Sequence, residues 1–473
     1  MIPARISFVG VVVLLLLRAI LAAELPLSAD EAYYWLWSKH LAAGYFDHPP
    51  AIAWLIRAGT MMFGDTPFGV RFAGIVLSLP ASWFVWRAAG LIVQDRDRAA
   101  LAALFFNLTL MASIELLAAT PDMPSLVAGA AFVYFLSRVQ MRDEAGAWLG
   151  AGIAAGLGLL AKFSALFLGG GALVWLIADR NARKWLLSPW PYLGGCLALL
   201  IFAPNLWWQS QHHWQTFIFQ FSRAGLGHFS PRFAVEFLAA QLGLATPLIF
   251  ILMAVGLWRA TRLSSDRLML ACLVWVGLGY FLEHSLHDRV QGNWPCFLYP
   301  ALAILAADAF APSSTRLRTI SLLAAPLAGL LLLAVYAQAL FVPLPMKKDP
   351  LARILGREFA PVGEVTAAMV KAHLAKAIIT TDYETTAWLR FNHPDVPVIQ
   401  LNEPQRFPQS PSAGAELLKQ PLIYLTELRR DQHPLVQRDF AYTGFPTQLQ
   451  TPSSLYMVYP VGRPKSSPLG KMP

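Results

Sequence analysis

Charged residues are scarce in this chain of 473 residues, since Asp, Glu, Lys and Arg together make up only 14% of it. A soluble domain is usually about one quarter charged. Hydrophobic residues reach 56%, and they come in long, rarely interrupted runs. This composition excludes an ordinary soluble globular protein and indicates a membrane protein.

Cysteine is also scarce, and the basic residues do not gather into one face. Cys196, Cys272 and Cys296 lie in apolar segments without a paired spacing, so the sequence implies neither a disulfide framework nor a zinc site. The formal net charge is +9, but the basic residues stand between apolar runs. We therefore interpret them as signals of membrane topology and expect no nucleic-acid partner.

The apolar runs predict an α-helical, polytopic fold with about eleven membrane spans, because about 20 apolar residues match the bilayer core. The first run, Ile6–Ala23, resembles a secretory signal, but Arg18 interrupts it and many spans follow, so we expect a retained helix. The predicted spans cover residues 6–23, 67–93, 99–118, 125–140, 147–161, 163–178, 189–207, 236–258, 268–284, 296–311 and 319–341.

Arginine and lysine predict the orientation, because they fall on alternate loops. By the positive-inside rule the amino terminus is cytoplasmic, and the longer loops and the tail lie outside. The loop residues that carry this prediction are Arg5, Arg87, Arg96, Arg98, Arg138, Arg142, Arg180, Arg183, Lys184, Arg259, Arg262, Arg267, Arg316 and Arg318.

Two domains follow from this pattern: a membrane domain over residues 1–341 and an outer domain over residues 342–473. The outer domain alternates helical and strand-like segments, which predicts a small α/β fold. Those segments are Gly363–Leu374, Ala377–Thr381, Glu384–Phe391, Val396–Gln400, Leu422–Thr426 and Ser454–Tyr459. In the first outer loop, the aromatic-rich stretches 33–45 and 51–63 predict short interfacial helices.

Several ionisable residues stand at the outer membrane boundary, where they are functional candidates by default. Asp30 and Glu31 follow the first span; the alternative is a solvated helix start with Ser28 or Asp30 as the N-cap. Asp47 and His48 sit on a proline-bounded corner, which alone would suit an interfacial turn.

Asp122 and Lys162 are further candidates on the same predicted face. Asp122 could instead be the N-cap of the fourth span, and Lys162 could snorkel at a helix end. Asn293 opens the tenth span on that face, and Arg223 lies in another outer loop. Carboxylates and cations on one face suit a phosphorylated lipid substrate and an acid–base step.

The order of these motifs resembles the membrane glycosyltransferases of the GT-C fold. It is most similar to the superfamily of protein O-mannosyltransferases and lipid A aminoarabinose transferases. The resemblance covers residues 1–300, and it implies eleven to thirteen spans, interfacial helices in the first outer loop and an extracytoplasmic terminal domain. It also implies that a sugar is taken from a polyprenyl phosphate carrier. The motifs are Asp30-Glu31-Ala32-Tyr33-Tyr34, Gly44–Pro50, Pro121-Asp122 and Gly158–Lys162.

By that resemblance, Asp30 lies beside the acceptor and the reaction centre, Asp122 is the second catalytic aspartate, and Lys162 contacts the donor phosphate. The aminoarabinose branch has cations at the positions of His48 and Tyr33, so the resemblance leaves the sugar and the acceptor open. The further expected substrate-binding residues are Glu31, Tyr33, Tyr45, Asp47, His48, Arg223 and Asn293.

These features predict an integral enzyme of the bacterial inner membrane, surrounded by membrane lipids. It would move a sugar from undecaprenyl phosphate to lipid A, lipopolysaccharide or another envelope glycan on the periplasmic face. The need for a divalent metal ion stays open. One alternative is a lipid-linked sugar flippase or transporter, which should have half-molecule symmetry or broken helices, and the sequence indicates neither. Another alternative is a non-catalytic envelope-assembly subunit. That function would give the first-loop motifs, Asp30–Tyr34 and Gly44–Pro50, no role.

Overall fold

The computed structural model describes residues 2–222, 228–263, 265–310, 315–346, 349–467 and 469–473. It divides into two compact units. The helical unit comprises Met1–Ala23 and Ala42–Tyr336, and the sheet unit comprises Glu24–Leu41 and Ala337–Pro473. The start of the first loop thus belongs with the C-terminal region, an arrangement that a division at residue 341 does not anticipate.

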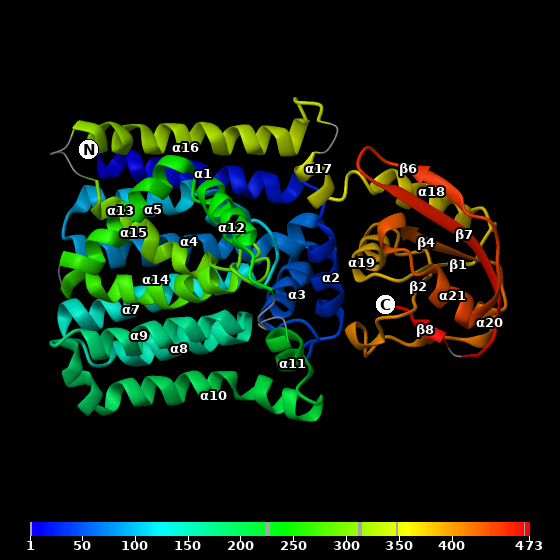
Figure 1. Ribbon diagram of the computed structural model, residues 1–473, viewed down its shortest axis with the longest axis horizontal. Helices are drawn as coiled ribbons and strands as arrows, with labels where there is room; N and C mark the ends of the chain where they lie inside the picture. Colours follow the sequence, from blue (N-terminus) through cyan, green and yellow to red (C-terminus); the bar gives the residue numbers. More distant parts are fainter. Residues whose placement is uncertain (1, 223–227, 264, 311–314, 347–348, 468) are drawn as a thin grey trace. The chain divides into compact units, whose positions relative to one another are not determined.

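Long helices of the helical unit run side by side, and α8 packs against both α7 and α10 (Figure 1). Short 3-10 turns at Phe163–Ala165 and Cys296–Leu298 lead into α9 and α15. The helices are α1 (Ala4–Glu24), α3 (Ala51–Phe63), α4 (Pro67–Val93), α5 (Arg96–Leu108), α6 (Leu110–Glu115), α7 (Asp122–Arg142), α8 (Ala147–Ala161), α9 (Leu166–Ala178), α10 (Pro189–Gln211), α11 (Gln215–Ser222), α12 (Pro231–Leu244), α13 (Pro247–Leu263), α14 (Ser265–His284), α15 (Tyr299–Asp308) and α16 (Thr315–Phe341).

Within the described ranges, 5 helices are long and apolar enough to cross a membrane: α1, α4, α10, α14 and α16. The predicted spans 67–93 and 147–161 coincide with α4 and α8. The other predicted spans also fall on helical segments, several of them shorter than a bilayer crossing. The chain is therefore a helical membrane protein.

The span predicted over residues 236–258 is not one continuous helix, because α12 and α13 meet at an angle of 109°. Thr246, between them, has a φ of +62°, in the left-handed region that a β-branched residue rarely adopts. Pro247 follows, and a proline disfavours helical backbone at the residue before it. The expectation that the chain has no broken helix is corrected at this position.

Arg18 is fully buried in α1 and bonds this helix to its neighbours. Its Nη1 donates to Ser78 Oγ at 2.9 Å and its Nη2 to Asn107 Oδ1 at 3.4 Å. Asn107 in turn donates through Nδ2 to Ser82 Oγ at 2.9 Å. The cation that interrupts the first apolar run thus ties α1 to α4 and α5.

We expect Arg18→Met to lower the thermal unfolding midpoint of the purified protein by several degrees. The variant keeps the side-chain length but removes the donors, and a hydrogen bond from a charged group contributes about 1.5–3 kcal/mol. Tryptophan fluorescence during heating in detergent measures the midpoint. Arg180→Met, at an exposed position, is the matched control. Equal midpoints for the two variants would contradict this role for Arg18.

The sheet unit contains one mixed sheet with the strand order β3-β8-β2-β1-β4-β7-β5, and β6 pairs with β7. Strand β1 is parallel to β2 and β4, while the remaining pairs are antiparallel. Its strands are β1 (Ala377–Thr380), β2 (Val398–Gln400), β3 (Ser412–Ala413), β4 (Leu422–Glu427), β5 (Phe440–Thr443), β6 (Thr447–Gln450), β7 (Leu455–Pro464) and β8 (Leu469–Lys471). Its helices are α2 (Ala29–Lys39), α17 (Pro350–Ile354), α18 (Ala360–Lys371), α19 (Tyr383–Asn392), α20 (Ala415–Leu418) and α21 (His433–Asp439).

Both faces of this sheet are covered. Ile378 of β1 belongs to one apolar cluster and Ile379 to the other, because successive side chains of a strand point to opposite faces. The predicted C-terminal α/β fold is confirmed.

Helix α2 packs against α19 within the same unit. The predicted helical stretch 33–45 is wrong at both ends, since α2 begins at Ala29 and ends at Lys39. The predicted stretch 51–63 coincides with α3.

Candidate active site

A buried ion pair joins two of the predicted site residues in the helical unit. Asp122 is the first residue of α7, and Lys162 is the C-cap of α8. Lys162 Nζ lies 2.7 Å from Asp122 Oδ1, and the two side chains are only 13% and 5% exposed. Burying two charges costs several kcal/mol per ion even when they pair, so a buried pair is weak evidence for a role in stability alone.

Asn293 and Cys296 complete the surroundings of the Asp122 carboxylate. Asn293 Nδ2 donates to Oδ2 at 2.9 Å, and Cys296 Sγ donates to Oδ1 at 3.3 Å. The carboxylate therefore has a partner on each oxygen and is fixed in orientation. This arrangement holds the Lys162 ammonium at a defined position.

The two structural alternatives for Asp122 and Lys162 are wrong. Pro121 occupies the N-cap position of α7 and makes no side-chain capping bond, while the Asp122 carboxylate contacts Lys162 and Asn293 instead. The Lys162 amine is buried and paired, so it does not snorkel to the membrane surface. Their roles in catalysis and phosphate binding stay predictions.

Sequence reasoning missed two buried residues near this pair. Cys296 was read only as an unpaired cysteine, although it follows Asn293 by three positions. Glu115, 6% exposed, accepts a hydrogen bond from Thr120 Oγ1 at 3.1 Å in the turn before α7. A carboxylate inside a predicted apolar span was the signal that could have identified Glu115.

The proline-bounded corner of the first loop is fixed by α10 and α11. Thr216 Oγ1 donates to the Tyr45 carbonyl at 2.6 Å, and Gln220 Nε2 donates to the Asp47 carbonyl at 2.5 Å. A Cβ at Gly44 would lie 2.5 Å from Trp208, so only glycine fits this close approach. These hydrogen bonds and this close packing hold the corner against α10 and α11.

The side chains of this corner differ in accessibility. Tyr45 is buried, its Oη accepts a hydrogen bond from the Ala42 N–H at 3.1 Å, and burial raises its pKa to about 12. Asp47 is 7% exposed, and His48 is half-buried. At neutral pH the Tyr45 hydroxyl is therefore a neutral hydrogen-bonding group.

In the sheet unit, Ser28 is the N-cap of α2 and Asp30 is not. Ser28 Oγ accepts from the Glu31 N–H at 3.2 Å, and Glu31 Oε2 accepts from the Ser28 N–H at 2.9 Å. This reciprocal capping box gives Glu31, which is 1% exposed, a structural role. Asp30 is exposed.

Residues of the C-terminal region surround Asp30 and Tyr33 within the same unit. Tyr383 Oη donates to Asp30 Oδ1 at 3.0 Å. The Tyr33 and Tyr383 ring centres are 4.7 Å apart, and the Arg406 guanidinium lies 4.5 Å from the centre of the Tyr383 ring. Neither Tyr383 nor Arg406 was assigned a catalytic or substrate-binding role from the sequence, because Tyr383 lies 353 positions from Asp30 along the chain and Arg406 lies further still.

Arg223 lies outside the described residues. Among the residues that the structure does describe, no three His, Cys, Asp or Glu side chains form a group that could hold a metal ion.

Sequence comparisons connect the chain with transferases that use lipid-linked sugars. Residues 47–208 match the family model described as dolichyl-phosphate-mannose-protein mannosyltransferase. The lipid A galacturonosyltransferase RgtD of Rhizobium johnstonii is 31% identical over 291 residues, which are 59% of each chain. The undecaprenyl phosphate-alpha-4-amino-4-deoxy-L-arabinose arabinosyl transferase 1 of Sodalis glossinidius is 28% identical over 299 residues, 58% of this chain and 50% of that protein. The matched region thus spans about half the length of these curated relatives.

Solved structures extend the similarity to almost the whole chain. ArnT from Cupriavidus metallidurans superimposes with a TM-score of 0.65 at 18% identity, covering 95% of this chain and 97% of ArnT. The oligosaccharyltransferase of Archaeoglobus fulgidus superimposes with a TM-score of 0.51 at 11% identity, covering 96% and 74%. The family match, the relatives and the shared fold agree with one another: the chain is similar to the membrane glycosyltransferases of the GT-C fold.

Proposed function

We propose that this protein transfers a sugar from an undecaprenyl phosphate carrier to lipid A or a related glycan of the bacterial envelope. The observation that carries the proposal is the buried Asp122–Lys162 pair with Asn293 on the second carboxylate oxygen. The names of the relatives support it, since one acts on lipid A and others use an undecaprenyl phosphate sugar. ArnT has also been crystallised with undecaprenyl phosphate, and that structure superimposes with a TM-score of 0.64.

The reaction is a single displacement at the anomeric carbon. The bond from this carbon to the phosphate oxygen breaks, and its electron pair stays on the phosphate. The acceptor oxygen forms the new bond from the opposite side, which inverts the anomeric configuration. The leaving phosphate gains negative charge as the bond breaks, and Lys162 is the cation we assign to stabilise it.

Lys162 suits this role because Asp122 holds its ammonium group in a buried environment. There a fixed cation stabilises developing charge more strongly than it would in water. A lysine amine has three donor positions, so the contact with Asp122 leaves it able to donate to a phosphate oxygen as well. Asp122 and Asn293 are thus assigned to position Lys162 rather than to attack the sugar.

We assign Asp30 the role of taking the proton from the acceptor hydroxyl. Its carboxylate is exposed, and the Tyr383 hydroxyl donates to Oδ1 at 3.0 Å, which fixes the orientation of the group. For a hydroxyl acceptor, Asp30 takes the proton as the new bond forms. A phosphate acceptor needs no strong base, and Asp30 would then orient it.

The fine topology is part of the same proposal. About eleven spans, a cytoplasmic amino terminus and a periplasmic sheet unit would follow from the alternate basic loops. The shorter apolar helices, such as α8 and α9, would then cross only part of the bilayer or pass through it with their flanking turns. Reporter fusions after Ala309 and after Pro350 would measure this orientation, and a periplasmic signal at Ala309 would contradict it.

A transporter remains the second candidate because α12 and α13 form a broken helix. Transporters built from repeats have such breaks at corresponding positions of both halves. Within the described ranges only one helix pair is bent in this way. The unpaired break and the buried Asp122–Lys162 pair favour the enzyme.

Reconstituted vesicles distinguish these functions. Purified protein receives a synthetic undecaprenyl phosphate sugar, carrying either galacturonic acid or 4-amino-4-deoxyarabinose, together with lipid A. We expect mass spectrometry to detect lipid A with one added sugar and an equal amount of released undecaprenyl phosphate. Donor that crosses the bilayer without being consumed would support a transporter instead. Repeating the assay with EDTA measures the metal requirement.

A further inference from the structure

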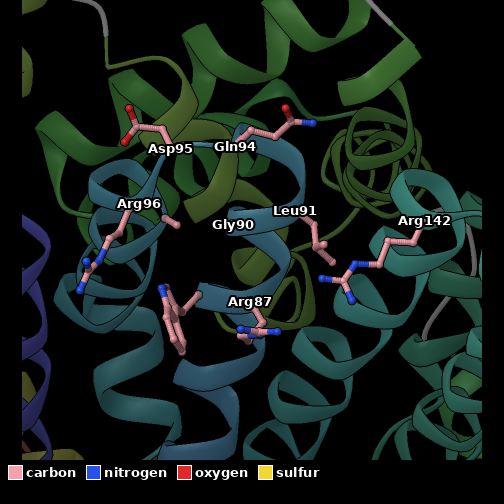
Figure 2. A pocket seen from close by; sticks show the side chains of 9 residues that line it. Arg87, Gly90, Leu91, Gln94, Asp95, Arg96 and Arg142 are labelled. Atoms are coloured by element: carbon pink, nitrogen blue, oxygen red, sulfur yellow. The ribbon is translucent and has the colours of Figure 1, made fainter.

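Three arginines from three helices surround one cavity of about 340 Å³ in the helical unit (Figure 2). Arg87 comes from the last turns of α4, Arg96 from the start of α5 and Arg142 from the end of α7. Trp86 and Leu91 add an apolar wall. In the close view Arg142 extends from α7 toward Leu91, and Arg87 lies between Arg96 and Arg142.

Asp95 also lines the cavity, but in the close view its carboxylate points away from the three arginines. Asp95 Oδ1 caps α5 by accepting from the Arg98 N–H at 2.8 Å, and Asp97 Oδ1 accepts from the Ala4 N–H at 2.8 Å. On the other side of the cavity, Asp143 pairs with Lys184 and Glu144 with Arg138.

The three guanidinium groups therefore outnumber the single carboxylate, that of Asp95, among the residues that line the cavity. None of them has an ion pair with a carboxylate in the part of the chain that the structure describes. Arg87 stacks instead on aromatic rings, 5.6 Å from the Trp86 centre and 5.9 Å from that of Trp83. Like charges around one cavity repel, so an anion bound between them lowers the free energy of this arrangement.

Two features indicate which anion fits. Guanidinium groups bind phosphate through paired hydrogen bonds, and the amino-terminal end of α5 adds a partial positive charge. The cavity lies at the ends of α4 and α7, and tryptophan beside it is typical of the headgroup level of a bilayer. Phosphate is abundant at that level, attached to lipids.

We propose that the Arg87–Arg96–Arg142 cavity binds the phosphate group of an anionic membrane phospholipid. This site is separate from the Asp122–Lys162 pair, which lies at the opposite end of α7. Its occupancy does not depend on sugar transfer. Basic pockets between helices are a known way to bind anionic headgroups, whereas arginines that only set topology need no common cavity.

Lipid binding to the full-length protein in a neutral detergent tests the proposal. Native mass spectrometry and thermal unfolding are measured while phosphatidylglycerol, zwitterionic phosphatidylcholine or inorganic phosphate is added. We expect saturable retention of phosphatidylglycerol and a higher unfolding midpoint with it, and neither effect with phosphatidylcholine. If inorganic phosphate alone gives the same midpoint and displaces the lipid, the site takes a soluble anion and the lipid assignment is overturned.

Matched variants separate this cavity from general positive charge. Arg87→Gln, Arg96→Gln and Arg142→Gln combined should weaken phosphatidylglycerol binding at least about tenfold, since each charged hydrogen bond is strong. The control combines Arg5→Gln, Arg180→Gln and Arg183→Gln, which removes the same charge elsewhere and should leave binding intact.

Two further variants keep the test decisive. Replacing the three cavity residues by lysine preserves the charge but should recover only part of the binding, because lysine lacks the planar fork. If the triple glutamine variant does not fold, the single change Arg142→Gln, at an exposed helix end, is measured instead. Equal losses in the cavity and control variants, or none in the cavity variant, would overturn the proposal.

Discussion

Asp30→Asn is expected to reduce sugar transfer to a hydroxyl acceptor by about 10²–10⁴-fold, the usual contribution of a positioned general base. The amide keeps the shape of the side chain but cannot take a proton. Asp30 is exposed and does not cap α2, so the change should leave the fold intact. Transfer rates are measured with purified enzyme and saturating donor, beside the unfolding midpoint. Near-normal turnover would remove Asp30 from the mechanism.

Tyr383→Phe provides the graded counterpart of this variant. It removes the 3.0 Å hydrogen bond to Asp30 Oδ1 but keeps the aromatic packing with Tyr33 and Arg406. A donor to a carboxylate favours its charged form. The acid limb of the pH–rate profile should therefore move to higher pH. The transfer rate should fall less at alkaline pH than at acid pH. A uniform loss at every pH would indicate that Tyr383 has only a structural role.

Lys162→Ala is expected to raise the lipid donor concentration needed for half-maximal transfer by upwards of about a hundredfold. Removing one partner from a buried ion pair costs about 3–5 kcal/mol. Lys162→Arg should recover only part of the donor affinity, because its planar fork presents the donors differently from an ammonium group. Titrating the donor against constant acceptor measures both variants.

The partner of Lys162 makes a sharper version of this experiment possible. Lys162→Ala leaves the Asp122 carboxylate buried without its cation, so part of its effect is lower stability. Combining Asp122→Asn with Lys162→Met removes both charges and should restore the unfolding midpoint. Donor binding should stay lost, because no cation remains for the phosphate. Recovery of transfer in this double variant would show that the pair is only structural.

Local patterns in the sequence predicted the features that depend on neighbouring residues. The apolar runs predicted α4 and α8 with their observed bounds, because hydrophobicity and helix ends are properties of contiguous segments. In the outer domain, the predicted segments 377–381 and 422–426 correspond to β1 and β4. The two motifs of the first loop, Asp30–Tyr34 and Gly44–Pro50, indicated the superfamily for the same reason, because each is a contiguous segment.

Predictions failed where weak local signals competed with a strong pattern. The apolar run 236–258 predicted one continuous helix, and the single helix-breaking pair Thr246–Pro247 within it was given too little weight. The helix ends at this pair in the structure. Arg18 was predicted to interrupt the first span, but nothing in the sequence indicated that Ser78 and Asn107 receive its hydrogen bonds. Hydropathy averages over a window and carries no information about which buried polar groups pair.

The sequence alone therefore established a helical membrane protein, a terminal α/β domain and the types of residue in its candidate site. Only the tertiary structure decided their partners. Asp122 meets Lys162 across 40 positions and Asn293 across 171, while Asp30 meets Tyr383 across 353. Such contacts arise from the packing of whole helices and strands, and no local propensity or periodicity encodes which distant elements will pack together.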